Sequence, residues 1–402
     1  MVQLKKKFLG IILSLLTMIL TAGSPLYAQN TRLSGEMIVE TSNLSSGKWT
    51  LPYVTAHSAV LLDLETGELL YDRDGNVQRP PASTTKIMTA ILALELTEPE
   101  EITTVSEKAG GVGESSIYLD KGDKIKIGEL LEGALLSSGN DACVALAENT
   151  AGSQDEFIRL MNQKAASLGA YNTNFVNPNG LPDPNHYSTA FDLALITRYA
   201  MNNPQFAEIV SQKYSVISFE EPRKSQNAKN TNKLLWNYSL ADGVKTGTTN
   251  AAGKCLVASA SKDGRRLICV VLNAPDRFGD AQRLLQWGFD YTGIIEIGKK
   301  GDVAGNFPIS DTEIPLVLGE DIRLCLEKDT IKGLKMQINL RTEIDYPIKE
   351  GDILGHYQIY AEDKLLKEVP LLAQHDGENP GNLPGRVRIF VDDLLDFFAK
   401  KG

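Results

Sequence analysis

Three short polar motifs, far apart along the chain, place the strongest constraint on how it can fold. They are Ser83–Lys86 (Ser-Thr-Thr-Lys), Ser138–Asn140 (Ser-Gly-Asn) and Lys245–Gly247 (Lys-Thr-Gly). Together they supply a hydroxyl nucleophile, an amine base, a polar relay and a cation suited to a carboxylate. Acyl transfer by a serine enzyme needs this set. If the fold brings the three motifs together, the protein attacks a carbonyl next to a free carboxylate.

Only the first of the chain's Ser-x-x-Lys segments opens a helical pattern. Ser45–Lys48 lies in a polar stretch, and Ser259–Lys262 runs into a predicted hairpin turn. After Lys86, by contrast, apolar residues recur at helical spacing from Ile87 to Leu94. We therefore predict that Ser83 lies at the start of a helix, where residues three apart share one face. Ser-x-Asn also recurs elsewhere, so the ordered set of three motifs carries the prediction.

The first two motifs suggest a proton-transfer system without histidine. The Ser83 hydroxyl would be the nucleophile, and Lys86 would be its base if burial and a nearby cation lower the pKa of the amine. Lys245 could be that second cation. Ser138 could pass a proton from Lys86 to the leaving nitrogen, and the Asn140 amide could hold both Lys86 and a substrate amide.

The third motif suits recognition of the substrate's end. Lys245 and Thr246 fit a terminal carboxylate, and Gly247 would let the substrate backbone approach closely. The backbone N–H groups of Ser83 and Thr248 would form the oxyanion hole.

Arg277 follows a Pro-Asp turn and could share the carboxylate with Lys245, or it could be an ordinary surface arginine. The four histidines, His57, His186, His356 and His375, lie outside all three motifs, so a Ser-His-Asp triad is not expected.

Composition excludes several other classes of function. The net charge of -10 argues against a nucleic-acid partner, because phosphate binding needs a basic face. No clustered cysteine or histidine spacing suggests a metal site, and no cofactor is expected. The four cysteines are scattered through apolar stretches, which favours buried thiols over a disulfide framework. The 402 residues leave room for two domains.

The two ends of the chain resemble targeting segments. Residues 1–28 combine three lysines, an apolar run too short to span a bilayer comfortably, and small residues. We predict a cleaved signal peptide, with an uncleaved anchor as the alternative. In residues 381–402, apolar side chains gather on one side of a would-be helix with basic residues at both ends. This favours a membrane-surface helix, although such a helix could also dock on the protein itself or on a partner.

Between these ends we predict two domains. Residues 29–47 are a polar linker. In residues 48–295, strands precede and follow a mostly helical stretch, which predicts a three-layer α/β domain. In residues 296–380, short apolar runs alternate with Gly, Asp and Pro turns, which predicts a small all-β domain. The strands expected there are Ile314–Leu318, Ile322–Leu326, Met336–Leu340 and Leu354–Tyr360.

At its motifs, the chain resembles the low-molecular-mass penicillin-binding proteins, specifically the serine-type D-alanyl-D-alanine carboxypeptidases. Pro81–Thr89 resembles the active-serine segment of that family, Ser138–Ala142 its second segment and Asp242–Thr249 its third. Asn179–Leu181 and Leu285–Phe289 are similar to further family landmarks. The order of catalytic domain, β domain and amphipathic tail matches as well, so the resemblance covers nearly all of the mature chain.

The resemblance implies a β-lactamase/transpeptidase-like fold and removal of the terminal D-alanine from peptidoglycan pentapeptides. The reaction would pass through an acyl-enzyme on Ser83, and penicillin would acylate the same serine. It also implies an exported protein at the outer face of the cytoplasmic membrane. Thr248 stands where some relatives have histidine. The catalytic and binding roles carry over to Ser83, Lys86, Ser138, Asn140, Lys245, Thr246 and Gly247, and that of Arg277 follows with a variable loop spacing.

Three other functions remain open at this point. The first is a β-lactamase. Such an enzyme usually has a Glu-x-x-Leu-Asn segment between the second and third motifs, and the chain has none. A D,D-endopeptidase acting on peptidoglycan cross-links is a second alternative. A wall-binding protein with a lapsed site is the third, although every catalytic residue type is present. The oligomeric state is not predicted.

Overall fold

The computed structural model describes residues 34–38, 51–309, 312–341, 344 and 346–377. These residues form two compact units, one containing residues 51–297 and 322–333 and the other residues 34–38, 298–321 and 334–377. The predicted signal peptide and the predicted tail helix lie outside the described residues. Within the described part, no helix has both the length and the apolar character needed to cross a bilayer.

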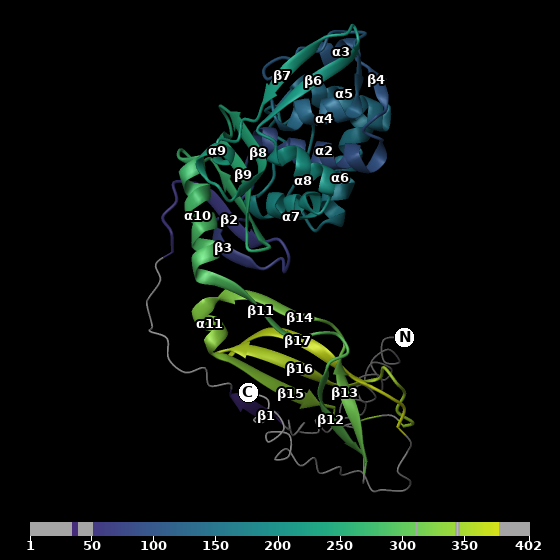
Figure 1. Ribbon diagram of the computed structural model, residues 1–402, viewed down its shortest axis with the longest axis vertical. Coiled ribbons are helices and arrows are strands. Elements are labelled where there is room, and N and C mark those ends of the chain that lie inside the picture. The colour runs from purple at the N-terminus through teal and green to yellow at the C-terminus, as the bar shows by residue number, and fades with distance from the viewer. Residues whose placement is uncertain (1–33, 39–50, 310–311, 342–343, 345, 378–402) are drawn as a thin grey trace, which may run out of the picture. The chain divides into compact units, whose positions relative to one another are not determined.

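A five-stranded antiparallel sheet forms the framework of the first unit (Figure 1). The turn residues Glu65–Gly67 and Lys262–Arg265 each predict a hairpin, and both are present, since β2 pairs with β3 and β9 pairs with β10. The strand order β3-β2-β10-β9-β8 leaves β8 at one edge. The strands are β2 (Ser58–Asp63), β3 (Leu69–Arg73), β8 (Ala241–Thr249), β9 (Gly253–Lys262) and β10 (Arg265–Leu272).

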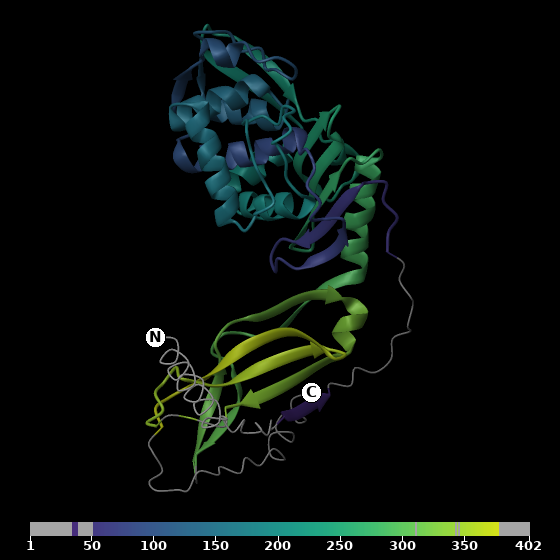
Figure 2. The same cartoon turned by 180° about the vertical axis from the view of Figure 1, so that it is seen from behind.

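Both faces of this sheet are buried, which explains why its central strands are continuously apolar. In β2, Val60 and Leu62 pack into one core cluster, whereas Ala59 and Leu61 pack into the other. Helix α10 (Arg277–Tyr291) covers the second face, and the larger group of helices covers the first (Figures 1 and 2). The predicted three-layer α/β architecture is confirmed.

The helical layer lies between β3 and β8 in sequence. The segment Ser153–Glu156 has the sequence of a capping box, and the Ser153 hydroxyl does accept the Glu156 N–H at 3.2 Å at the start of α6. The helices of this layer are α2 (Lys86–Leu96), α3 (Glu107–Gly110), α4 (Ile127–Leu135), α5 (Asn140–Ala151), α6 (Gln154–Ser167), α7 (Ala190–Met201) and α8 (Pro204–Ser211). The short helix α9 (Leu234–Asn237) packs instead in the core cluster that contains α10.

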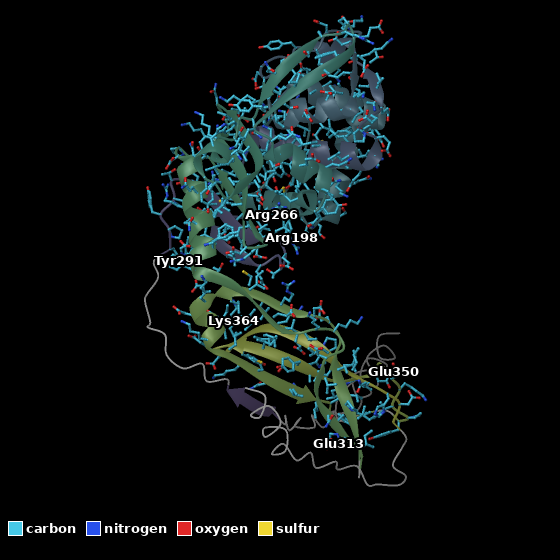
Figure 3. The ribbon with its side chains drawn as sticks, viewed as in Figure 1. Arg198, Arg266, Tyr291, Glu313, Glu350 and Lys364 are labelled. Atoms are coloured by element: carbon cyan, nitrogen blue, oxygen red, sulfur yellow. The ribbon has the colours of Figure 1, made fainter. Side chains whose placement is uncertain are left out.

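Helix α7 and strand β10 are both hydrogen-bonded to the backbone of Leu64, at the end of β2. Arg198 of α7 donates from Nε to the Leu64 carbonyl at 2.7 Å, while the Leu64 N–H donates to the Arg266 carbonyl at 3.0 Å. Arg198 and Arg266 lie close together in Figure 3, which labels both. These two hydrogen bonds connect the helical layer to β10 through Leu64.

A second sheet interrupts the stretch that we predicted to be mostly helical. Strands β4 (Ile102–Thr104), β5 (Lys124–Lys126), β6 (Tyr214–Glu221) and β7 (Ser225–Lys229) form it in that order. Two of these strands are only three residues long, and β5 and β6 lie far apart in sequence. Local apolar periodicity therefore gave little sign of the sheet.

The second unit is a six-stranded antiparallel sheet in the order β1-β15-β16-β17-β13-β12. This confirms the small all-β part that follows the α/β part. Strand β1 falls within the predicted linker. The strands are β1 (Ser34–Ile38), β12 (Val303–Ile309), β13 (Thr312–Leu318), β15 (Leu334–Leu340), β16 (Ile353–Ala361) and β17 (Lys364–Ala373).

The predicted strand Ile322–Leu326 is present, but it does not belong to the six-stranded sheet of the all-β unit. Strand β14 (Ile322–Glu327) pairs with β11 (Thr292–Gly298) rather than with the six-stranded sheet, and α11 (Lys328–Lys332) follows it. Arg265 explains the placement, because its Nη2 lies 2.7 Å from the Cys325 sulfur and 2.8 Å from the Thr292 hydroxyl. A polar anchor of this kind leaves no trace in the apolar pattern.

Candidate active site

Ser83 lies at the start of a helix, as predicted. Residues Ala82–Thr85 form one 3₁₀ turn, and α2 begins at Lys86. The side chain of Ser83 is partly exposed, whereas Lys86 is completely buried. The Lys86 Nζ atom lies 3.0 Å from the Ser83 Oγ atom, which is hydrogen-bonding distance. The first motif therefore places an amine directly against a hydroxyl.

Two further acceptors surround the Lys86 amine. Its Nζ atom lies 2.8 Å from Asn140 Oδ1 and 2.7 Å from the Asn179 main-chain oxygen. Both are carbonyl-type oxygens, which accept hydrogen bonds and cannot donate them. A neutral amine has two N–H bonds and one lone pair. When the two N–H bonds point at these carbonyls, the lone pair is left facing the Ser83 hydroxyl, as a general base requires.

Burial lowers the pKa of Lys86, because the charged ammonium form loses its hydration. The negative fields of Cys143, Asp141 and Glu114 oppose this change but are weaker than the effect of burial. Lys245 is also buried, and its pKa is lowered well below the usual range by burial first and by the Lys86 charge second. For Lys86, burial is the only cause that lowers the pKa, so the Lys245 charge does not supply the second cation that we expected.

The second motif lies between α4 and α5. Ser138 has a backbone φ of 65°, and Asn140 is the first residue of α5. The Asn140 side chain uses both of its ends, since Oδ1 accepts from Lys86 and Nδ2 donates to the Gly113 carbonyl at 3.0 Å. The structure therefore brings Asn140 to the base, as predicted, and links it to the segment around Gly113.

The third motif lies within strand β8 at the edge of the sheet. An edge strand has main-chain N–H and C=O groups with no partner on its outer side, so it can pair with an extended peptide. Lys245 Nζ donates to the Thr246 carbonyl at 3.0 Å, and the Thr246 hydroxyl lies 2.6 Å from that of Thr231. The structure thus adds Thr231, which the sequence did not single out.

Two glycines approach the backbone of the nucleophile. A Cβ atom on Gly247 would lie 2.9 Å from the Ser83 nitrogen, which requires something to shift. A Cβ atom on Gly180 would lie only 1.9 Å from the Ala82 carbonyl oxygen, and Gly180 has a φ of +87° that favours glycine. Both segments therefore reach Ser83 only because these positions have no side chain.

Arg277 is half-buried against β8, so it is not an ordinary surface arginine. Its Nη1 atom donates to the Gly247 carbonyl at 2.9 Å and to the exposed Thr248 hydroxyl at 2.8 Å. Its Nε atom is buried and has no hydrogen-bond partner among the described residues. A buried donor without a partner is costly, which suits a guanidinium that receives an anion at this edge.

Sequence reasoning missed the part played by the loop between α6 and α7. Asn179 contributes its main-chain carbonyl to the base, and His186 fixes the loop beneath the first motif. The His186 Nδ1 atom accepts the Val176 N–H at 3.0 Å, so Nε2 carries the proton and donates to the Thr85 hydroxyl 2.8 Å away. Burial lowers the pKa of His186 to about 4. The Asn-Gly-Leu segment was the only sequence signal for this loop.

Two known protein families match successive segments of the chain. The family described as D-alanyl-D-alanine carboxypeptidase matches residues 46–276, and the family described as the C-terminal domain of penicillin-binding protein 5 matches residues 289–379. D-alanyl-D-alanine carboxypeptidase DacF of Bacillus subtilis is 34% identical over 338 residues, which are 81% of this chain and 87% of that protein.

Further relatives agree. D-alanyl-D-alanine carboxypeptidase DacC of Escherichia coli is 34% identical over 360 residues, 85% of this chain and 88% of that protein. The crystal structure of penicillin-binding protein 5 from Haemophilus influenzae matches with a TM-score of 0.73 and 30% identity, covering 82% of this chain and 100% of that one.

Proposed function

Because the chain belongs to the D-alanyl-D-alanine carboxypeptidase family, we propose that Ser83 is its nucleophile and Lys86 its general base. The protein is a serine-type D-alanyl-D-alanine carboxypeptidase, which removes the terminal D-alanine from peptidoglycan peptides and binds β-lactams. One observation supports the two roles above all others, namely the 3.0 Å contact between Lys86 Nζ and Ser83 Oγ with two carbonyls occupying the other positions around the amine.

The reaction begins with attack of the Ser83 oxygen on the carbonyl carbon of the penultimate D-alanine. Lys86 takes the hydroxyl proton, and the C–O bond forms as the carbonyl becomes an oxyanion. The backbone N–H groups of Ser83 and Thr248 stabilise this oxyanion in our proposal. Gly247 supports the arrangement, since its α-carbon lies against the Ser83 nitrogen without a side chain to block it.

Collapse of this intermediate breaks the C–N bond and releases D-alanine. Its nitrogen needs the proton that Lys86 now carries, and we propose Ser138 as the relay. The product is an ester between Ser83 and the shortened peptide. Water then attacks the ester carbonyl, Lys86 takes a proton from that water, and the Ser83 oxygen leaves with a proton, which restores the enzyme.

The free carboxylate of the substrate is assigned to the edge of β8. We propose that Lys245, Thr246 and Arg277 bind it, because they put a guanidinium, an amine and a hydroxyl at this edge. The Arg277 Nε atom without a partner supports this role. Burial lowers the pKa of Lys245, and the negative charge of a bound carboxylate would act in the opposite direction and favour the charged amine.

The alternative activities are not favoured. The relatives DacF and DacC are named D-alanyl-D-alanine carboxypeptidases, and neither name describes an endopeptidase or a β-lactamase. A D,D-endopeptidase would use the same residues on a larger leaving group, so substrate competition distinguishes it. The ratio of D-alanine release to cross-link cleavage measures that difference.

Family membership also implies an exported cell-wall enzyme. We propose the finer arrangement in which residues 1–28 are cleaved and residues 381–402 bind the outer face of the cytoplasmic membrane. Between them, residues 29–47 would be the linker, residues 48–295 the catalytic domain and residues 296–380 the β domain. Deleting residues 384–402 should release the protein from membranes and leave its activity on soluble peptides intact. A truncated protein that stays on the membrane would refute the anchor.

Labelling with penicillin tests the catalytic assignment. A labelled penicillin should form a long-lived adduct on the peptide that contains Ser83, and Ser83→Ala should abolish it. Rapid release of hydrolysed penicillin would indicate a β-lactamase instead. The absence of both an adduct and D-alanine release from a pentapeptide would refute the enzymatic assignment altogether.

A further inference from the structure

Thr231 is a polar residue beside the active site to which the proposed reaction gives no role. It lies in the short segment between β7 and α9, and α9 packs beside the edge strand β8 (Figure 1). Its hydroxyl lies 2.6 Å from the hydroxyl of Thr246, which we assign to the substrate carboxylate. Thr231 is exposed, whereas Thr246 is buried. The two hydroxyls therefore form a pair that leads from the surface to the carboxylate site.

Two buried asparagines fix the backbone on either side of Thr231. The Asn230 Nδ2 atom donates to the Gln212 carbonyl at 2.9 Å, just after the end of α8. The Asn232 Nδ2 atom donates to the Gly243 carbonyl of β8 at 2.7 Å. The Asn230 Oδ1 atom also accepts the Asn232 N–H at 2.9 Å, which closes the turn around Thr231. Thr231 is therefore attached to α8 on one side and to β8 on the other.

The main chain of Thr231 reaches the second motif. Its N–H donates to the Leu136 carbonyl at 3.2 Å, and Leu136 lies two residues before Ser138. Thr231 thus contacts the segment of the second motif through its backbone and the third motif through its side chain. A hydroxyl on such a support is held in place before a ligand arrives, so little order has to be gained on binding.

The direction of the hydrogen bond between the two hydroxyls decides what Thr246 can offer. A hydroxyl has one proton to donate, whereas a carboxylate only accepts. Within the described part of the chain, neither the Thr231 nor the Thr246 hydroxyl has another hydrogen-bond partner. The Thr246 proton is free for a carboxylate only when Thr231 is the donor of the pair. In the reverse arrangement, Thr246 would present a lone pair to an anion.

We propose that Thr231 is a positioning residue for recognition of the substrate's terminal carboxylate. Its hydroxyl donates to Thr246, which leaves the Thr246 proton for the carboxylate. This role rests on the proposed function, because it takes Thr246 as a carboxylate ligand. Successive hydrogen bonds that point the same way polarise one another, so the Thr246 hydroxyl becomes a better donor to the anion. Thr231 thereby acts on substrate binding through Thr246.

Substitution of Thr231 tests the role with a peptide that ends in D-Ala-D-Ala. Thr231→Val removes the hydroxyl at nearly constant shape. It should raise KM about threefold to tenfold and change kcat by less than about twofold, because one neutral hydrogen bond is lost and it acts on binding. Thr231→Ser keeps the hydroxyl and should keep the wild-type KM. Thr104→Val is the matched control and should keep both constants, since Thr104 is an exposed threonine on β4, at the opposite edge of the four-stranded sheet from β7.

A double variant shows whether Thr231 acts through Thr246. Thr246→Val alone should raise KM about tenfold or more, because a hydrogen bond to a charged group is lost. Adding Thr231→Val to this variant should raise KM by less than about twofold further, because the hydroxyl that Thr231 orients is already absent. A residue that only supports the turn would instead raise KM by the same factor in both backgrounds. Thermal unfolding of each variant confirms that folded protein is compared.

The outcomes separate the possible errors. An unchanged KM in Thr231→Val, or an equal increase in both backgrounds, would overturn the role of Thr231 and leave the proposed function standing. A fall in kcat without a rise in KM would overturn it as well. If Thr246→Val leaves KM unchanged, Thr246 does not bind the carboxylate, and the role of Thr231 falls with that assignment. If the wild-type enzyme releases no D-alanine from the peptide, the proposed function itself has failed.

Discussion

Replacing Asn140 by aspartate should convert the site into one whose base cannot release its proton. The substitution keeps the shape of the side chain but puts a negative charge where a neutral amide oxygen lies 2.8 Å from Lys86 Nζ. Two unit charges about 4 Å apart attract each other by about 4 kcal/mol at an effective dielectric constant of 20. Since one pKa unit corresponds to about 1.4 kcal/mol, the pKa of Lys86 should rise by about three units.

The pH dependence of D-alanine release measures this change. The acid limb of kcat/KM reports the pKa of the base in the free enzyme, so Asn140→Asp should move that limb up by about three pH units. Within the limb, activity at a fixed pH should fall about 1,000-fold, because each unit is a factor of ten. Activity should return at high pH. Asn140→Ala is the control, because it removes the amide without adding charge and should not raise the limb.

A different pattern would contradict the assignment of Lys86 as base. If Asn140→Asp lost the same factor at every pH while its limb stayed in place, Lys86 would not be the titrating group. The aspartate also faces the Gly113 carbonyl without a donor, which costs stability. Thermal unfolding of both variants therefore has to accompany the kinetics, so that loss of folded protein is not mistaken for loss of rate.

Three further predictions concern the surroundings of the nucleophile. Gly180→Ala should destabilise the fold by about 2 to 3 kcal/mol and slow labelling by penicillin, because a Cβ atom would lie 1.9 Å from the Ala82 oxygen; thermal unfolding and labelling rates measure this. The pKa of His186, about 4 in the fold against 6.5 for the free side chain, predicts a stabilisation that is complete above about pH 6.5. As pH falls to about 4 roughly 3 kcal/mol should be lost, and urea unfolding of the wild type and His186→Gln at several pH values would reveal it. Arg277→Lys should raise KM more than it lowers kcat, because a lysine keeps the charge but loses the planar fork beside Gly247. If KM and kcat changed by equal factors with a peptide that lacks the terminal carboxylate, this role would be contradicted.

Much of the catalytic unit was predictable because its signals are local. A helix after Pro81 and two hairpins follow from periodicity and turn residues, and the buried faces of β2 follow from its apolar run. The order of the three motifs identified Ser83, Lys86 and Asn140, and in the structure Lys86 lies within hydrogen-bonding distance of both other residues.

The parts that escaped prediction depend on contacts between distant segments. The Asn179 oxygen that binds Lys86 is a main-chain group, so no residue type announces it. The sheet β4-β5-β6-β7 joins short strands across long stretches of sequence. Strand β14 is placed by Arg265, whose partners Cys325 and Thr292 lie in separate elements.

The burial of two amines has a thermodynamic consequence for the whole protein. Lys86 and Lys245 are 0% and 1% exposed, and neither has a carboxylate within ion-pairing distance in the described part of the chain. Removing an amine from water without a counter-charge works against folding. An apolar side chain of similar length, as in Lys86→Met, should therefore give a more stable protein that cannot catalyse. The site is maintained at the expense of the fold, so selection for heat resistance alone would tend to erase the activity.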